Sequence, residues 1–253
     1  MVLSEKVENH IHDFLNNKNR RKKIKDGLSF LPHLFTLGNV FFGFCSLVFV
    51  AKGKLAPAAY LILFGALMDV LDGRIARFVG SESDFGVQLD SLADAISFCL
   101  APAFLVYFWQ LRRLGLVGIV ISFLFLGFGL MRLARFNVIH QEQKDFFLGL
   151  PTTIAGCFTA IIFLNFKGAV DSVWFLGTIV ILVLSLSFLM ISHVRFLTFK
   201  QRLFHLKRNW YVVLFILLFA ILSVLQFEKV LLMFFLLYFS SAIFVKVILN
   251  LRR

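Results

Sequence analysis

The chain reads Asp69-Val-Leu-Asp72-Gly73-Arg-Ile-Ala76-Arg77 and, eight residues later, Gly86-x-x-x-Asp90-x-x-x-Asp94. An ionised side chain at the centre of a bilayer costs roughly 2.5–3.5 kcal/mol, so four carboxylates in two apolar segments need a partner such as a cation. Asp69 and Asp72 are three residues apart and Asp90 and Asp94 are four apart, so each pair shares a helix face. Two antiparallel helices would join the pairs into an oxygen-rich site suited to Mg²⁺ or Mn²⁺.

The composition predicts an all-α, polytopic integral membrane bundle. Hydrophobic residues make up 60% of the chain, 34 residues are phenylalanine, and only 16% are charged. Apolar blocks of about 20 residues are long enough to cross a bilayer. We expect about eight transmembrane helices, near residues 34–51, 55–79, 86–108, 114–136, 150–166, 172–194, 210–227 and 230–249.

These spans divide the chain into four predicted parts: a basic N-terminal segment (1–31), a six-span core (32–194), a basic loop (195–209) and two further spans (210–253). Leu3, Val7 and Ile11 share one helical face, which predicts an N-terminal interfacial helix on the membrane surface. A disordered tail is the alternative for these residues. Residues 1–31 contain no apolar core, so we expect no cleavable signal peptide.

The formal net charge of +12 is distributed as in a membrane protein. With eight spans and a cytoplasmic N-terminus, all but six of the 26 lysines and arginines fall on the cytoplasmic side. By the positive-inside rule, both termini and the aspartate site then face the cytoplasm, in the cell membrane. The basic clusters 18–25 and 195–208 are explained by topology alone or by attraction to anionic membrane lipids. This distribution argues against a nucleic-acid partner.

The sequence contains no motif that supports several other chemistries. The three cysteines, in separate apolar spans with no CxxC pair, are expected to be small core residues: Cys45, Cys99 and Cys157. Patterns typical of nucleotide hydrolysis, dinucleotide redox chemistry and serine or zinc hydrolases do not occur. A cation transporter remains an alternative class, but transporters usually place polar residues on broken helices near the bilayer midplane.

The quoted aspartate stretch resembles the signature of the CDP-alcohol phosphotransferase family, D-x2-D-G-x2-A-R-x8-G-x3-D-x3-D, at every fixed position. The resemblance covers about residues 30–155. Within the family, two further stretches resemble the phosphatidylserine synthase branch. They are Leu89-Asp-Ser-Leu-Ala-Asp94 with Ser97-Phe98 and Ala101-Pro-Ala103, and Arg132-Leu-Ala-Arg135-Phe-Asn137 with Gly149-Leu-Pro151.

The resemblance implies a transferase that moves the phosphatidyl group of CDP-diacylglycerol to the hydroxyl of L-serine, releasing CMP. It further implies two divalent ions, with Asp69, Asp72 and Asp90 as the main ligands. Asp94 would lie near the second ion and act as the general base. It also suggests a homodimer.

For the CDP-lipid pocket, the resemblance implies that the nucleotide approaches the backbone at Gly73, beside Ala76, with Arg77 available to a phosphate. The start of the first span also contributes to the nucleotide pocket, through Pro32, His33, Thr36 and Asn39. The family usually has asparagine where His33 stands, so an interfacial histidine is the alternative there. Ser83, near Gly86, either reaches a phosphate or caps the next helix.

The acceptor pocket is expected to include Arg132, Arg135 and Asn137. The two arginines lie one helical turn apart at the cytoplasmic end of the fourth span. Recognition of the serine carboxylate is the favoured reason for their position, and membrane topology is the alternative. Glycerol 3-phosphate and inositol phosphate remain alternative acceptors, although both call for more basic side chains.

Overall fold

The computed structural model describes residues 30–80, 83–139, 146–168, 172–192 and 195–197, together with Lys229 and Met233. The predicted interfacial helix, most of the basic loop and, but for Met233, the two C-terminal spans lie outside these residues. The described helices are α2 (Leu31–Ala51), α3 (Leu55–Val79), α4 (Asp84–Asp94), α5 (Ala101–Trp109), α6 (Leu116–Ile139), α7 (Thr152–Phe166) and α8 (Val173–Ile191).

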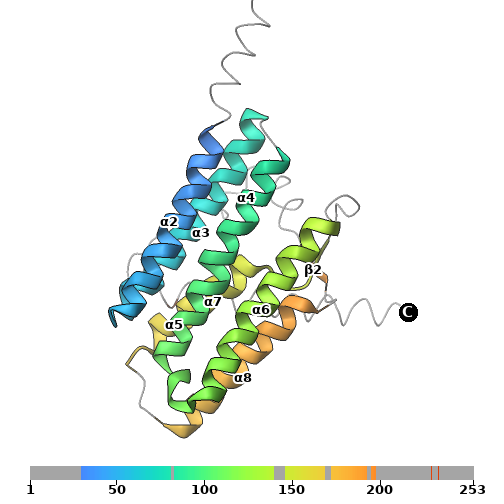
Figure 1. Cartoon of the computed structure of the whole chain (residues 1–253). Helices are drawn as coiled ribbons and strands as arrows, with labels where there is room; N and C mark the ends of the chain where they lie inside the picture. Colours follow the sequence, from blue (N-terminus) through green and yellow to red (C-terminus); the bar gives the residue numbers. More distant parts are fainter. Residues whose placement is uncertain are drawn as a thin grey trace, which may run out of the picture.

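Five helical segments in the described part of the chain are long and apolar enough to cross a membrane. They are α2, α3, the continuous rod from α4 through α5 (Asp84–Trp109), α6 and α8. Figure 1 shows them as a bundle in which α2, α3 and α4 run side by side and α6 lies along α8. The prediction of a polytopic helical membrane protein is confirmed at this level, and each described span begins and ends within a few residues of its predicted bounds.

The predicted fifth span corresponds to α7, which is shorter than the five segments above and largely buried. α7 has 15 residues, or about 22 Å at the usual helical rise. Most of its side chains are buried, and it packs against α3, α5 and the segment that precedes α5. Its apolar composition therefore reflects burial in the bundle as well as any contact with lipid.

The rod that contains Asp90 and Asp94 includes a π-helical turn that the sequence did not predict. This turn, η1 (Ala95–Leu100), follows Asp94 directly. Glycines from three different helices approach its buried residues: Gly43 of α2 at Ser97, Gly129 of α6 at Cys99 and Gly156 of α7 at Phe98. The bundle therefore closes around η1.

The described residues also include two short strands that the all-α prediction did not foresee. β1 (Phe146–Leu148) pairs antiparallel with β2 (Arg195–Leu197), so the segment before α7 is joined to the segment after α8. Gly149 follows β1 at a φ of 78°, a left-handed conformation that glycine adopts without strain. The chain then enters α7 through Pro151.

The packing at Gly156 gives a prediction about stability. An alanine Cβ at this position would lie 2.8 Å from the Phe98 carbonyl oxygen, which belongs to backbone that cannot easily move. Gly156→Ala should therefore destabilise the protein by about 1–3 kcal/mol, a typical cost of overpacking. Gly127→Ala is the control, since nothing lies within 4 Å of the added methyl group. Thermal unfolding in detergent should separate the two variants, and equal melting temperatures would contradict this account.

Candidate functional site

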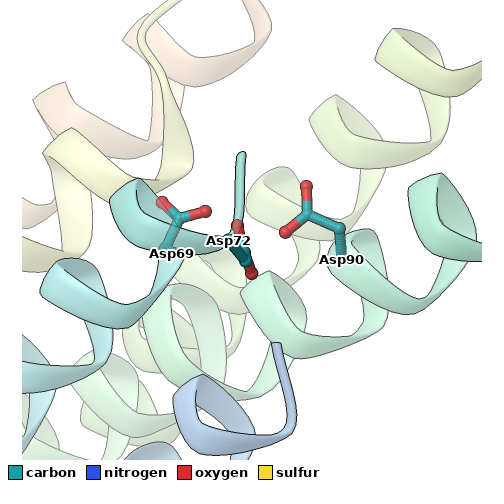
Figure 2. A group of neighbouring side chains, drawn as sticks. All are labelled: Asp69, Asp72 and Asp90. Carbon is teal, nitrogen blue, oxygen red and sulfur yellow. The ribbon is translucent and has the colours of Figure 1, made fainter. Parts of the chain in front are cut away.

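The site forms where α3 and α4 face each other. Asp69 and Asp72 come from one turn of α3, and Asp90 comes from α4. Each of the three offers one carboxylate oxygen, and these oxygens all lie within 4.8 Å of one another. Figure 2 shows Asp72 between the other two, with Asp69 and Asp90 on opposite sides of it. The structure thus brings Asp90 of the second pair to both aspartates of the first pair.

The unpaired oxygens of these acids fit a divalent cation. Asp72 is only 5% exposed. Among the described residues, one buried oxygen of Asp72 and one of Asp90 have no hydrogen-bond partner. Buried carboxylates without partners are costly, and their mutual repulsion adds to the cost. Three carboxylate oxygens at this separation match the ligand type that Mg²⁺ and Mn²⁺ prefer, so the cluster can hold a divalent metal.

Asp94 lies outside this three-acid group, one turn further along α4 toward the bundle core. It still interacts electrostatically with Asp69 and Asp90, and the positive charge of Arg132 acts on it from α6. One of its carboxylate oxygens is buried and has no hydrogen-bond partner among the described residues. Arg132 is itself only 8% exposed, and its guanidinium lies 5.9 Å from the centre of the Phe136 ring. Asp94 is therefore influenced both by the acid cluster and by a buried cation.

The first two turns of α2 bring the predicted nucleotide residues close to α3 and α4. Pro32 and Thr36 are buried, and the Thr36 hydroxyl donates to the Pro32 carbonyl at 3.1 Å while lying within hydrogen-bonding reach of Asp72. The His33 ring packs against the Phe85 ring of α4 with centroids 5.6 Å apart. This contact explains His33 as a packing residue between helix ends.

Asn39 lies deeper, in the contact between α2, α3 and η1. It is fully buried, and its backbone carbonyl accepts a hydrogen bond of 2.9 Å from the Ser97 hydroxyl. A Cβ on Gly65 would lie 3.0 Å from its side-chain oxygen, so glycine gives the Asn39 amide its room.

Ser83 is the N-cap of α4, which confirms the capping alternative. Its hydroxyl accepts a hydrogen bond of 3.1 Å from the Gly86 N–H. A Cβ on Gly86 would lie 3.2 Å from the same hydroxyl and 3.5 Å from His33 Nε2. Glycine at this position therefore leaves room for the Ser83 cap, while the contact with His33 would be an ordinary one.

The region around Gly73 is open by comparison. A Cβ there would meet one described atom within 4 Å, an Arg77 nitrogen at 3.9 Å, so internal packing does not require the glycine. Ala76 is half-buried on the same helix. Arg77 is exposed, and its Nε donates to the Gly73 carbonyl at 2.7 Å. This part of α3 has room for a ligand, and Arg77 is next to it.

The three predicted acceptor residues have different surroundings. The charge of Arg132 acts on Asp94, whereas Arg135 donates to the Ile191 carbonyl at the end of α8 at 3.1 Å. Asn137 accepts a hydrogen bond from Ser91 at 3.0 Å and donates to Gln88 at 3.2 Å. The hydrogen bonds of Arg135 and Asn137 therefore link α6 to α8 and α4, whereas the charge of Arg132 acts on Asp94.

Sequence reasoning missed two threonines at the start of α7. The Thr153 hydroxyl donates to Asp69 Oδ2 at 3.4 Å, and the Thr152 hydroxyl accepts from Arg132 Nη1 at 3.4 Å. The available signal was a pair of polar residues directly after Gly149-Leu150-Pro151. That signal was weak, because threonines in apolar helices usually bond to their own backbone.

Comparison with known proteins identifies the family. The family model described as CDP-alcohol phosphatidyltransferase matches residues 29–189, more than half of the chain. The chain belongs to this family. The acid cluster and its supporting helices all lie within the matched region, and membership sets aside the cation-transporter alternative.

Several similar relatives have closely related names. The CDP-diacylglycerol–serine O-phosphatidyltransferase of Helicobacter pylori strain J99 is 34% identical over 202 residues, which cover 78% of this chain and 81% of the relative. The protein of the same name from Bacillus subtilis strain 168 is 30% identical, over 69% of this chain and 93% of the relative. An archaetidylserine synthase of Methanothermobacter thermautotrophicus is 38% identical, over 53% of this chain and 57% of the relative.

The geometry of the acid cluster predicts metal binding that depends on individual carboxylates. Asp90→Asn removes a charged ligand from the three-acid group and should weaken Mn²⁺ binding at least about tenfold, because ligation needs the ionised carboxylate. Asp84→Asn is the matched control, since Asp84 is exposed at the opposite end of the same helix. Titration of purified protein with Mn²⁺, followed by electron paramagnetic resonance, measures both. Equal affinities for the two variants would rule out the cluster as the metal site.

Proposed function

We propose that the protein transfers the phosphatidyl group of CDP-diacylglycerol to the hydroxyl of L-serine, forming phosphatidylserine and CMP. The observation that carries this proposal is the Asp69–Asp72–Asp90 cluster, built from the signature residues of a family whose similar members bear this activity in their names. The buried Arg132, whose charge acts on Asp94, supports an acceptor that carries a carboxylate.

Asp69, Asp72 and Asp90 would hold a divalent metal, Mg²⁺ or Mn²⁺, and Asp94 would contribute to a second ion. When bound, such ions neutralise charge on the pyrophosphate and on the departing CMP. The partnerless oxygens of Asp72, Asp90 and Asp94 support this assignment.

Asp94 is proposed as the general base and Arg132 as the partner of the serine carboxylate. Asp94 accepts the proton of the serine hydroxyl while the serine oxygen bonds to the phosphatidyl phosphorus. The bond from that phosphorus to the oxygen of CMP then breaks, and CMP leaves with the bonding electron pair. An arginine next to the base would hold serine with its hydroxyl near the acid, which reduces the entropic cost of reaction. Arg135 and Asn137 act in this proposal by holding α6 in place.

The CDP-lipid pocket is proposed on the face of α3 near Gly73, Ala76 and Arg77, with α2 and the start of α4 around it. The room beside Gly73 supports close approach of the nucleotide, and Arg77 is the available cation for a phosphate. The remaining proposed members shape the pocket walls: Pro32, His33, Thr36, Asn39, Ser83 and Gly86.

The orientation in the membrane is proposed from the charge distribution. The count of eight spans is proposed from the apolar blocks of the sequence. With that count, the positive-inside rule predicts cytoplasmic termini and a site that opens to the cytoplasm. The division into an N-terminal segment (1–31), a six-span core (32–194), a basic loop (195–209) and two C-terminal spans (210–253) belongs to the same proposal. A homodimer remains a prediction from the family resemblance.

The proposed reaction is tested with purified protein, CDP-diacylglycerol and Mg²⁺ or Mn²⁺. L-serine, glycerol 3-phosphate and inositol phosphate are supplied in turn, with CMP release and the lipid product as readouts. Serine alone should support rapid release and give phosphatidylserine, and excess chelator should stop it. Release with a phosphorylated acceptor instead would replace serine in the proposal.

The role of Asp94 gives a kinetic prediction. Asp94→Asn keeps the size of the side chain but cannot accept a proton, so turnover should fall at least about a hundredfold. Binding of CDP-diacylglycerol should change little, because Asp94 lies outside the three-acid group. Loss of nucleotide binding with retained turnover at saturation would make Asp94 a ligand and not the base.

The role of Arg132 predicts a selective effect on the acceptor. Arg132→Leu should raise KM for serine far more than KM for CDP-diacylglycerol, because it removes the cation assigned to the serine carboxylate. Arg112→Leu is the control, an exposed arginine at the far end of the bundle from the acid cluster. If Arg132→Leu affects both substrates equally, the arginine serves the packing or topology of α6.

A further inference from the structure

Two adjacent side chains in the first turn of α7 contact the proposed site. One contacts the proposed metal-binding side at Asp69, and the other contacts the proposed acceptor side at Arg132. Thr153 donates its hydroxyl to Asp69 Oδ2, and Thr152 accepts from Arg132 Nη1, each at 3.4 Å. Asp69 belongs to the acid cluster, whereas Arg132, on α6, acts electrostatically on Asp94. One helical turn therefore contacts the metal side and the acceptor side together.

These hydroxyls differ from several others in the described helices. Thr159, Thr178 and Ser187 each donate to the carbonyl four residues earlier in their own helix, the usual solution in an apolar segment. Thr153 donates to a carboxylate of another helix instead. Thr152 is 1% exposed, and its oxygen receives a buried guanidinium.

The start of α7 is also held firmly in place by the end of α8. The Leu150 N–H donates to the Leu189 carbonyl at 3.0 Å. Any side chain at Gly149 would collide with the Met190 carbonyl oxygen, and Gly149 adopts a positive φ that favours glycine. Arg135 of α6 donates to the Ile191 carbonyl at 3.1 Å. The two threonines are thus presented from an anchored turn.

We propose that Thr152 and Thr153 are positioning residues that set the metal side and the acceptor side of the site relative to each other. Thr153 fixes the rotamer of the Asp69 carboxylate, and Thr152 fixes the direction of the Arg132 guanidinium. The Thr152 half rests on the proposed function, whereas the Thr153 half requires only that the acids bind a metal. Hydrogen-bond partners of metal ligands typically contribute 10–100-fold to metal affinity or activity.

Metal binding without substrates tests Thr153. Thr153→Val keeps the shape of the side chain and removes the donor, so Mn²⁺ affinity measured by electron paramagnetic resonance should fall about tenfold or more. Thr153→Ser restores the hydroxyl and should recover most of the affinity. Thr159→Val is the matched control, because the same change on the same helix removes only a bond to the Ala155 carbonyl. If Thr153→Val binds Mn²⁺ as tightly as Thr159→Val does, the inference fails.

Acceptor kinetics test Thr152 in the same set of purified proteins, compared at equal folded fraction by gel filtration. Thr152→Val should raise KM for serine at least about fivefold with little change in KM for CDP-diacylglycerol, since it loosens only the arginine assigned to the carboxylate. Thr152→Ser should restore the parent value. A proportional rise in both constants, or no rise, would overturn the role of Thr152.

An assay of the parent protein distinguishes failure of the proposed function from failure of this inference. The parent protein is first assayed for serine-dependent CMP release. If the parent uses another acceptor, the proposed function is wrong, and the Mn²⁺ titration still decides the role of Thr153.

Discussion

The arrangement of this protein depends on keeping several like charges together inside an apolar bundle. Asp69, Asp72 and Asp90 bring their oxygens within 4.8 Å of one another, with Asp94 close enough to interact. Such a cluster opposes folding unless a cation compensates it, because burial and mutual repulsion both disfavour the ionised carboxylates. The remaining helices therefore have to hold the acids in place while leaving room for their ligand.

At the end of the site nearest Asp94, the close packing around η1 holds the acid-bearing helix in place. The π turn begins directly after Asp94, and glycines of α2, α6 and α7 allow three helices to approach its buried residues. A π turn inserts an extra residue into a helix, and such turns often occur at functional sites.

Each side of the site is built from a different set of helices. α3 and α4 supply the acids, and α2 closes over them through Thr36 and His33. α6 supplies Arg132, and the anchored start of α7 contacts Arg132 and Asp69 together. A change in the packing of α7 or α8 would therefore alter the positions of the acids, even where the changed residues do not contact a substrate.

The sequence by itself determined the membrane class, the bounds of the described spans and the pairing of the aspartates. These features follow from hydropathy and helical periodicity, which are local properties of the chain. The repeated spacing of the acids also pointed to a cation before any contact was known. Only the tertiary structure decided which side chains from separate helices meet. It gave Arg132 different partners from those of Arg135 and Asn137. It also brought Thr153 to Asp69 and placed a π turn after Asp94. The physical reason is that these contacts join residues 20 to 84 positions apart or depend on the mutual fit of several helices, and no local pattern encodes them.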